Sequence, residues 1–337
     1  MSRFSPEMAS ELASASVFVT GGTGFVGSHL VETLLQSGCK DVRCLVRSDP
    51  KWLKGLPVRF IEGTLSDEAA LKQGLQGATH VFHVAALTRS TQWDDFYKAN
   101  VEGARLLLTL AANYSTIQNV LLVSSLAAIG ISSENIAQEN TAFAPVSMYG
   151  RSKAEMEQMT LEFESPWTIV RPPAVYGPRE TDIFTFFKTI SGGLCPVVGS
   201  AHIPALSLVH VDDLVIGMVQ AALSPTAQHK TYFLGGPAQY TWAEIRDAAT
   251  EALQRRVVTI SIPRIVMPTI GAISEGVGKI FGFYPPLNRE KAREIVSATI
   301  MCDSALAMSS FGYRPSKDLN LGVAETIQWY KDAKWLK

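Results

Sequence analysis

Short apolar runs alternate with amphipathic segments along the first half of the chain. Six runs are predicted as strands: SVFVT (16–20), VRCLV (42–46), VRFI (58–61), HVFHV (80–84), VLLVS (120–124) and WTIVR (167–171). Between them, apolar residues at helical spacing, such as Val26, Leu30 and Leu34, predict helices. Strands that alternate with helices and are almost wholly apolar are typical of a parallel sheet covered on both faces. The pattern predicts an α/β fold with a doubly wound, Rossmann-like parallel sheet.

The regular alternation of predicted strands and helices ends after about residue 178. LSLVHVDDL (206–214) is predicted as a strand entering a helix, and TYFLGG (231–236) as a further strand. From Tyr240 onward the pattern is mostly helical. We therefore expect a sheet domain of residues 14–178 and 206–238, with a smaller, mostly helical substrate-binding cap of residues 179–205 and 239–337.

The composition describes a globular protein, with 47% hydrophobic and 18% charged residues in 337. A formal net charge of −1 argues against a nucleic-acid partner. No apolar run is long enough for a membrane span, and four scattered cysteines do not form a disulfide framework, so we expect a cytoplasmic protein. The cysteines are Cys39, Cys44, Cys195 and Cys302.

His80 and His83 lie three apart on a predicted strand and point to opposite faces, so no metal site is predicted.

A glycine-rich loop stands between the first predicted strand and the first predicted helix. VFVTGGTGFVGSHL places Gly21, Gly24 and Gly27 where a tight turn and a close backbone approach to a pyrophosphate are needed. Since strand, loop and helix follow in order, the loop predicts a dinucleotide site. After the second strand the chain has Arg47 and no carboxylate before Asp49, which favours NADP(H), with NAD possible.

Three tyrosines are followed four residues later by a lysine, a spacing that puts both on one helical face. The spacing alone does not separate them. The pairs are Tyr149 with Lys153, Tyr313 with Lys317, and Tyr330 with Lys334.

TGGTGFVG, SSLAAIG, YGRSK, RPPAVYGPR and HVDDL resemble, in order and spacing, the extended short-chain dehydrogenase/reductase family of the NAD(P)-dependent epimerase/dehydratase type, over residues 16–240. The resemblance implies that Ser125, Tyr149 and Lys153 are catalytic. Ser125 is preferred to Ser124 because the family's serine precedes by five the glycine that matches Gly130. Pro315 interrupts the Tyr313 pair, and no strand-end serine precedes Tyr330, so Tyr149 is selected.

In this resemblance Tyr149 exchanges a proton with an alcohol or carbonyl, and Ser125 hydrogen-bonds the carbonyl oxygen. Lys153 and the cationic nicotinamide ring together lower the pKa of Tyr149, and Lys153 also holds the nicotinamide ribose. The implied cofactor contacts are Gly21, Thr23, Gly24, Phe25, Val26, Arg47, Thr64, Leu65, Val84, Ala85, Ala86, Tyr149, Lys153 and Pro172.

Two positions differ from the residues that are usual in the family, and a third matches one of them. Thr64 stands where the family usually has an aspartate that touches adenine, and Ala174 stands where it often has an asparagine. Asn100 matches a common family asparagine, although a buried structural amide is an equal alternative.

The residues after Ser125 include no carboxylate, which disfavours dehydration of a sugar. GATHVFHVAALT, VRCLVR and the C-terminal segment resemble dihydroflavonol reductases and the 3β-hydroxysteroid dehydrogenase-like branch. The apolar segment from Ile265 to Phe283 suits a lipophilic substrate; an ordinary cap core or a dimer-packing helix is the alternative. We expect an NADP(H)-preferring reductase or dehydrogenase of a hydrophobic or aromatic carbonyl compound, and the resemblance suggests a homodimer that includes the Tyr149 helix.

Two other functions are considered. A nucleotide-sugar epimerase with tightly bound NAD would need cations for a diphosphate, and a non-catalytic NADP-binding redox sensor is disfavoured by the Tyr149–Lys153 pair. The cap arginines available for a diphosphate are Arg179, Arg255, Arg264 and Arg289.

Overall fold

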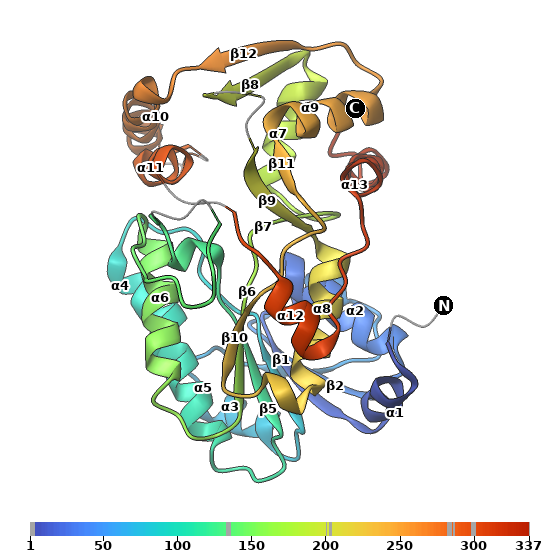
Figure 1. Ribbon diagram of the computed structural model, residues 1–337. Coiled ribbons are helices and arrows are strands. Elements are labelled where there is room, and N and C mark those ends of the chain that lie inside the picture. The colour runs from blue at the N-terminus through green and yellow to red at the C-terminus, as the bar shows by residue number, and fades with distance from the viewer. Residues whose placement is uncertain are drawn as a thin grey trace.

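Seven parallel strands form the central sheet in the order β10-β6-β5-β4-β1-β2-β3 (Figure 1). The computed structural model describes residues 4–132, 136–199, 201, 204–281, 285, 287–297 and 301–336. The strands are β1 (Ser16–Thr20), β2 (Asp41–Val46), β3 (Arg59–Glu62), β4 (His80–His83), β5 (Asn119–Val123), β6 (Trp167–Arg171) and β10 (Lys230–Phe233). The predicted strands and their parallel arrangement are confirmed.

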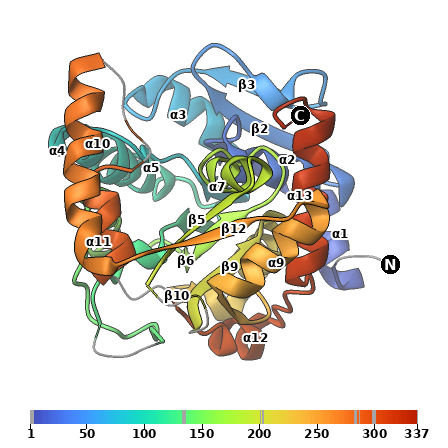
Figure 2. The same cartoon turned by 90° about the horizontal axis from the view of Figure 1, so that it is seen from above.

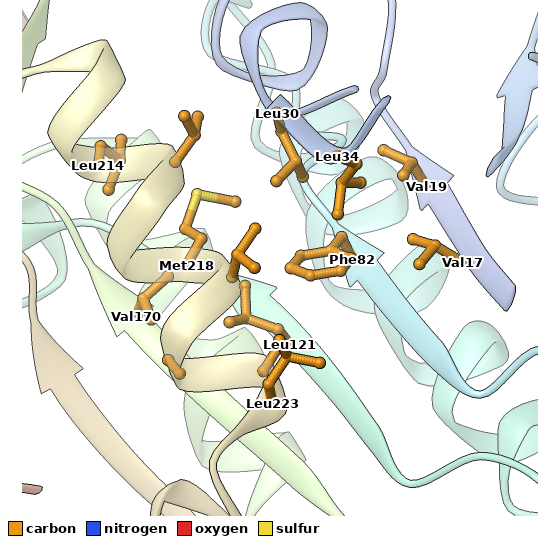
Figure 3. Close-up of a cluster of buried hydrophobic side chains, with 14 of the residues drawn as sticks. Val17, Val19, Leu30, Leu34, Phe82, Leu121, Val170, Leu214, Met218 and Leu223 are labelled. Atoms are coloured by element: carbon orange, nitrogen blue, oxygen red, sulfur yellow. The ribbon is translucent and has the colours of Figure 1, made fainter. Parts of the chain in front are cut away.

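Helices cover both faces of this sheet, as the apolar strands require. One face carries α2 (Phe25–Gln36) and α8 (Val211–Leu223); the other carries α3 (Glu68–Leu75), α5 (Gly103–Ala111) and α6 (Met148–Thr160). Figure 3 shows Leu34 of α2 and Met218 of α8 in one buried cluster with Phe82 of β4 and Leu121 of β5. Strand order reverses direction between β1 and β4, and open α/β sheets bind ligands at such a point, at the carboxyl ends of the strands.

A second group of elements stands beyond that edge (Figure 1). Its two small sheets contain β7 (Ala174–Tyr176), β9 (Pro204–His210) and β11 (Gln239–Thr241), and β8 (Leu194–Val198) with β12 (Val258–Ile262). Its helices are α7 (Asp182–Ser191), α9 (Trp242–Leu253), α10 (Met267–Phe281), α11 (Arg289–Ser297) and α13 (Leu319–Asp332). Because β7 follows β6 almost directly, this cap begins where the sheet's carboxyl edge ends.

The remaining elements are short, apart from the N-terminal helix α1 (Pro6–Ser14). They are α4 (Trp93–Phe96), a π-helical turn (Tyr97–Glu102), α12 (Ala305–Phe311) and 3-10 turns at Lys51–Leu53, Leu126–Ala128, Pro225–Ala227 and Arg264–Val266. Phe311 of α12 packs edge-on against Tyr232 of β10, although the sequence assigned residues 305–311 to the cap. The exact domain boundaries stay a prediction.

The helical segment between β4 and β5 is divided by the π-helical turn. Asn100 sits in this turn, fully buried, and its amide exchanges two hydrogen bonds with the backbone of Leu87 and donates a third to the Ser152 hydroxyl at 2.9 Å. A wider turn accommodates these bonds because it inserts one residue into the helix. Asn100 therefore has the structural role that was one of its two predicted alternatives.

Several large side chains of the apolar segment predicted from Ile265 are not buried in the cap, although Met267 of that segment is buried. Ile265, Ile273 and Phe281 are all exposed, the first by 85%. The interpretation of this segment as an ordinary cap core is therefore wrong for these side chains, while Phe283 lies outside the described residues. Within the described part of the chain, no helix combines the length and hydropathy needed to cross a bilayer.

Candidate active site

The predicted site residues come from loops that follow different strands of one parallel sheet. Since all seven strands run in the same direction, their carboxyl ends lie along one edge, where open α/β sheets bind ligands. The glycine loop follows β1, Arg47 follows β2, Ser125 follows β5 and Pro172 follows β6.

The glycine loop has the close packing that its spacing predicts. Gly21 has φ +78°, and a Cβ there would lie 2.4 Å from the backbone nitrogen of Ala85. A Cβ on Gly27 would lie 2.1 Å from the carbonyl oxygen of Gly21. Side chains are thus excluded at both positions.

The same loop leads into the N-terminus of α2. Gly24 caps this helix without a side-chain hydrogen bond, so N–H groups of the first turn, beginning at Phe25 and Val26, are open to an anion. Together with the bare glycine backbone, this end of α2 fits the pyrophosphate of a dinucleotide. Thr23 is half-buried in the loop just before it.

Arg47 and Asp49 differ in whether their side chains have hydrogen-bond or ion-pair partners. Arg47 is exposed beyond the end of β2, and among the described residues no hydrogen bond or ion pair holds its guanidinium. Asp49 accepts a hydrogen bond from the Lys51 backbone at 3.0 Å and pairs with Lys54 at 3.3 Å. Arg47 is therefore the available charged side chain after β2.

Other predicted cofactor contacts lie at the same sheet edge. Thr64 is exposed after β3 and its hydroxyl pairs with that of Ser66 at 2.9 Å, whereas Leu65 packs toward Gly103 of α5. Pro172 is buried and its carbonyl accepts a hydrogen bond from the Leu126 backbone at 2.9 Å. Val84, Ala85 and Ala86 follow β4, beside the glycine loop.

The two serines after β5 have different partners. The Ser124 hydroxyl is buried and donates to the Glu157 carboxylate. The Ser125 hydroxyl accepts from the Ala127 backbone at 3.1 Å and lies near enough to the Tyr149 hydroxyl to lower the pKa of that phenol. Only Ser125 shares the site with Tyr149.

Tyr149 is the second residue of α6, which Ser147 caps through a 3.1 Å bond from the Gly150 backbone. Burial raises the pKa of Tyr149 to about 12, the nearby Ser125 hydroxyl opposes this, and the charge of Glu294 adds to it. The lowering expected from Lys153 together with a bound nicotinamide ring stays a prediction.

Lys153 is buried one helical turn after Tyr149. Its ammonium donates to the Val123 carbonyl at the end of β5, at 2.6 Å. Burial lowers the pKa of Lys153 to about 8, and the charge of Glu157 raises it. Burial and the Lys153 charge also lower the pKa of His83, at the end of β4, to about 3.

Glu157, whose charge raises the pKa of Lys153, belongs to a buried ion pair with Arg171. Glu157 accepts two hydrogen bonds of 3.0 Å and one of 2.7 Å from the Arg171 guanidinium at the end of β6. Arg171 also donates to the Glu139 carbonyl at 2.9 Å. Glu157 was missed in the sequence, although it stands four residues after Lys153 on the same helical face.

Two further carboxylates reach the site from the cap. The Ser147 hydroxyl donates to Glu294 at 2.5 Å, and the Met148 backbone donates to Glu290 at 3.0 Å. Glu290 and Glu294 are four residues apart on α11, which lies next to the N-terminal end of α6 (Figure 1). Sequence reasoning did not find them, because only the fold brings residues 147 and 294 together.

The other two tyrosine–lysine spacings are structural. The Tyr313 hydroxyl donates to the Gly235 carbonyl at 2.7 Å, and the Tyr330 hydroxyl donates to the Glu180 carbonyl at 2.8 Å. Both tyrosines are buried, away from Ser125.

Within the described part of the chain, the four cap arginines share no contact. Arg179 pairs with Glu32 of α2 at 2.7 Å, and Arg289 lies 3.9 Å from Glu275 of α10. Arg255 lines a separate cavity of about 400 Å³ beside Arg246 and Arg256, and Arg264 lies near Gly199. They do not form one diphosphate site.

Comparison with known proteins gives consistent matches. Residues 17–235 match the model of the NAD dependent epimerase/dehydratase family. The ceramide reductase of Caulobacter vibrioides is 30% identical over 96% of this chain and 97% of its own. A putative dihydroflavonol 4-reductase of Synechocystis sp. is 28% identical over 95% of this chain and 96% of its own. An epimerase of Methanothermobacter thermautotrophicus has the same fold, with a TM-score of 0.79 at 19% identity, covering 98% of this chain and 97% of that one.

Proposed function

The chain belongs to the NAD-dependent epimerase/dehydratase family, and we propose that it is an NADP(H)-preferring oxidoreductase that interconverts a carbonyl and an alcohol on a hydrophobic small molecule. The observation that carries the proposal is the placement of Ser125 beside Tyr149, with Lys153 buried one turn away. This set can bind a carbonyl oxygen and exchange a proton with it.

The protonation state of the pair favours reduction. With a pKa of about 12, Tyr149 keeps its proton at neutral pH and can donate it to the oxygen of a carbonyl that is being reduced. Ser125 holds the same oxygen while negative charge develops, and the Lys153 ammonium stabilises that charge at short range. A bound nicotinamide cofactor supplies the hydride.

The surroundings of Tyr149 support an uncharged substrate. Glu290 and Glu294 place negative charge beside the N-terminus of α6, which disfavours an anionic group there. The cap arginines have no shared contact that would neutralise a diphosphate. The 30% identical relative is named a ceramide reductase, which supports a hydrophobic substrate for this chain as well.

Arg47 supports the choice of NADP(H). Its free guanidinium beyond β2 is suited to a 2′-phosphate, whereas Asp49 is already bonded to Lys51 and Lys54. No carboxylate between β2 and Asp49 competes for the adenosine ribose.

The test is a panel of long-chain ketones, aromatic ketones and UDP-sugars incubated with the purified protein and NADPH or NADH. We expect loss of NADPH absorbance in step with formation of the alcohol, measured by mass spectrometry. A separate chromatographic assay scores epimerised sugars, because epimerisation consumes no cofactor. Epimerisation of a UDP-sugar without reduction of any ketone would replace this proposal with an epimerase.

A further inference from the structure

A continuous stretch of the cap, residues 258–281, exposes large apolar side chains. It forms β12, the 3-10 turn Arg264–Val266 and α10. Single exposed apolar residues are common, but a run of them marks an interaction surface. We call the following residues the 258–281 apolar surface: Val258, Ile260, Ile265, Val266, Ile273, Val277 and Phe281.

On α10 the exposed residues form one stripe. Ile273, Val277 and Phe281 are spaced by four, so they share a face, and they are 63%, 41% and 73% exposed. The face that packs on α11 is different: a Cβ on Gly271 would lie 2.8 Å from the Cβ of Ala292. Contact with α11 therefore leaves the apolar stripe uncovered.

The position of α10 makes this stripe accessible. Seen from above, α10 lies at one edge of the molecule, at the end of β12 and beside α11 (Figure 2). Exposed apolar residues also occur earlier in the chain, in β12, where Val258 is 64% exposed and is paired with Leu194 of β8, which is 46% exposed.

The same region is basic in a chain of net charge −1. Residues 254–297 contain seven Lys and Arg against three Asp and Glu. Of the three acids, Glu290 and Glu294 are turned onto α6, and Glu275 lies near Arg289. Four exposed arginines form no ion pair among the described residues: Arg255, Arg256, Arg264 and Arg293.

We propose that the 258–281 apolar surface docks on an anionic lipid bilayer. Apolar side chains on one helical face insert at the boundary of headgroups and acyl chains, while neighbouring basic residues attract anionic headgroups. A second copy of the chain is a poorer occupant, because a symmetric contact would bring two net-positive segments together. The lipid surface complements both the apolar stripe and its charge.

Docking there would place the bilayer one helix away from the active site. The inner face of α10 packs on α11, and α11 bonds through Glu290 and Glu294 to the first residues of the Tyr149 helix. The proposal stands apart from the proposed reaction, since binding is measured without substrate or cofactor.

The experiment is co-sedimentation of the full-length protein with vesicles of phosphatidylcholine alone or rich in phosphatidylglycerol. We expect binding to the anionic vesicles that weakens as salt is raised. Ile273→Glu should lower the partition coefficient roughly tenfold or more, as expected for losing one inserted Ile side chain. Arg264→Ala should lower it on the order of fivefold. The matched control is Leu161→Glu, because Leu161 follows α6 and is also 63% exposed.

Because Ile273 is exposed, its variant should keep the thermal stability of the wild type, and melting curves check this. The proposal is overturned if the wild type does not co-sediment with anionic vesicles, or if Ile273→Glu and Leu161→Glu reduce binding equally. It is also overturned if Ile273→Glu, without vesicles, dissociates an oligomer seen by light scattering, since a second copy would then cover the surface.

Discussion

Glu157 follows Lys153 by one turn of α6, and its charge raises the pKa of a lysine that burial lowers to about 8. The Arg171 guanidinium and the Ser124 hydroxyl hold the Glu157 carboxylate in place. The charge of the lysine beside Tyr149 thus depends on a residue that touches neither the tyrosine nor Ser125.

This relationship predicts a pH profile. For carbonyl reduction, kcat/KM should fall as pH rises through about 8, because Lys153 loses the charge that stabilises the developing oxyanion. In Glu157→Gln the fall should begin at lower pH, since the charge that raises the Lys153 pKa is gone. Profiles of both proteins from pH 6 to 10 check this, and coinciding alkaline limbs would contradict it.

Stability should depend on pH through the same lysine. The folded-state pKa of Lys153 is lowered from 10.5 to about 8, so between these values the unfolded chain binds more protons than the folded one. The free energy of unfolding should therefore rise with pH across this window. Lys153→Met should lose that rise. Urea titrations at pH 8 and 10 compare the two proteins, and equal pH slopes would rule out this contribution.

The buried ion pair should matter for stability in its own right. Removing one partner with Arg171→Met leaves the Glu157 carboxylate buried without its main counterion, which should cost about 3–5 kcal/mol of unfolding free energy. The control is Arg105→Met, whose exposed pair with Glu162 should contribute less than about 1 kcal/mol. Similar losses in the two variants would show that burial does not set the energy of this pair.

Cofactor preference should depend on Arg47. Arg47→Ala should weaken NADPH binding roughly tenfold to a hundredfold, the effect of one charge-assisted hydrogen bond, and leave NADH binding unchanged. Arg59→Ala, an exposed arginine on β3, is the control. Fluorescence titration with each cofactor measures both. Tighter binding of NADH than NADPH by the wild type would reject the NADP(H) preference.

The contact between α11 and α6 should hold the cap over the site. Glu294→Ala removes the acceptor of the Ser147 hydroxyl, so backbone amides of residues 289–297 should exchange hydrogen faster. Arg293→Ala, on the same helix but without an ion pair among the described residues, should not have this effect. Mass spectrometry of peptides from α11 measures both, and equal exchange rates would show that Glu294 does not fasten the helix.

The sequence predicted the features that depend on local pattern. Alternating apolar runs predicted the strands of the sheet, and Gly21 with Gly27 predicted a loop in which no side chain fits. The strands and the glycine loop could be predicted because each depends on residues close together in the chain.

What the sequence missed depends on contacts across the fold. The Ser147–Glu294 bond joins residues 147 positions apart, and no spacing rule reports it. Burial, which only the packed structure reveals, raises the pKa of Tyr149, and the sequence reasoning did not include this effect. The exposure of Ile273 could not be predicted from the sequence either, because an apolar helical stripe gives the same pattern in a core and on a surface.

The central claim is that Tyr149 transfers the proton that accompanies reduction of a carbonyl compound. The most direct measurement compares Tyr149→Phe with Tyr330→Phe in single-turnover reduction of the best ketone by NADPH, because both tyrosines precede a lysine by four residues. Tyr149→Phe should slow the chemical step roughly 10²- to 10⁴-fold while NADPH still binds. Tyr330→Phe, which loses only a bond to the Glu180 carbonyl, should react at the wild-type rate. A wild-type rate in Tyr149→Phe would contradict the account.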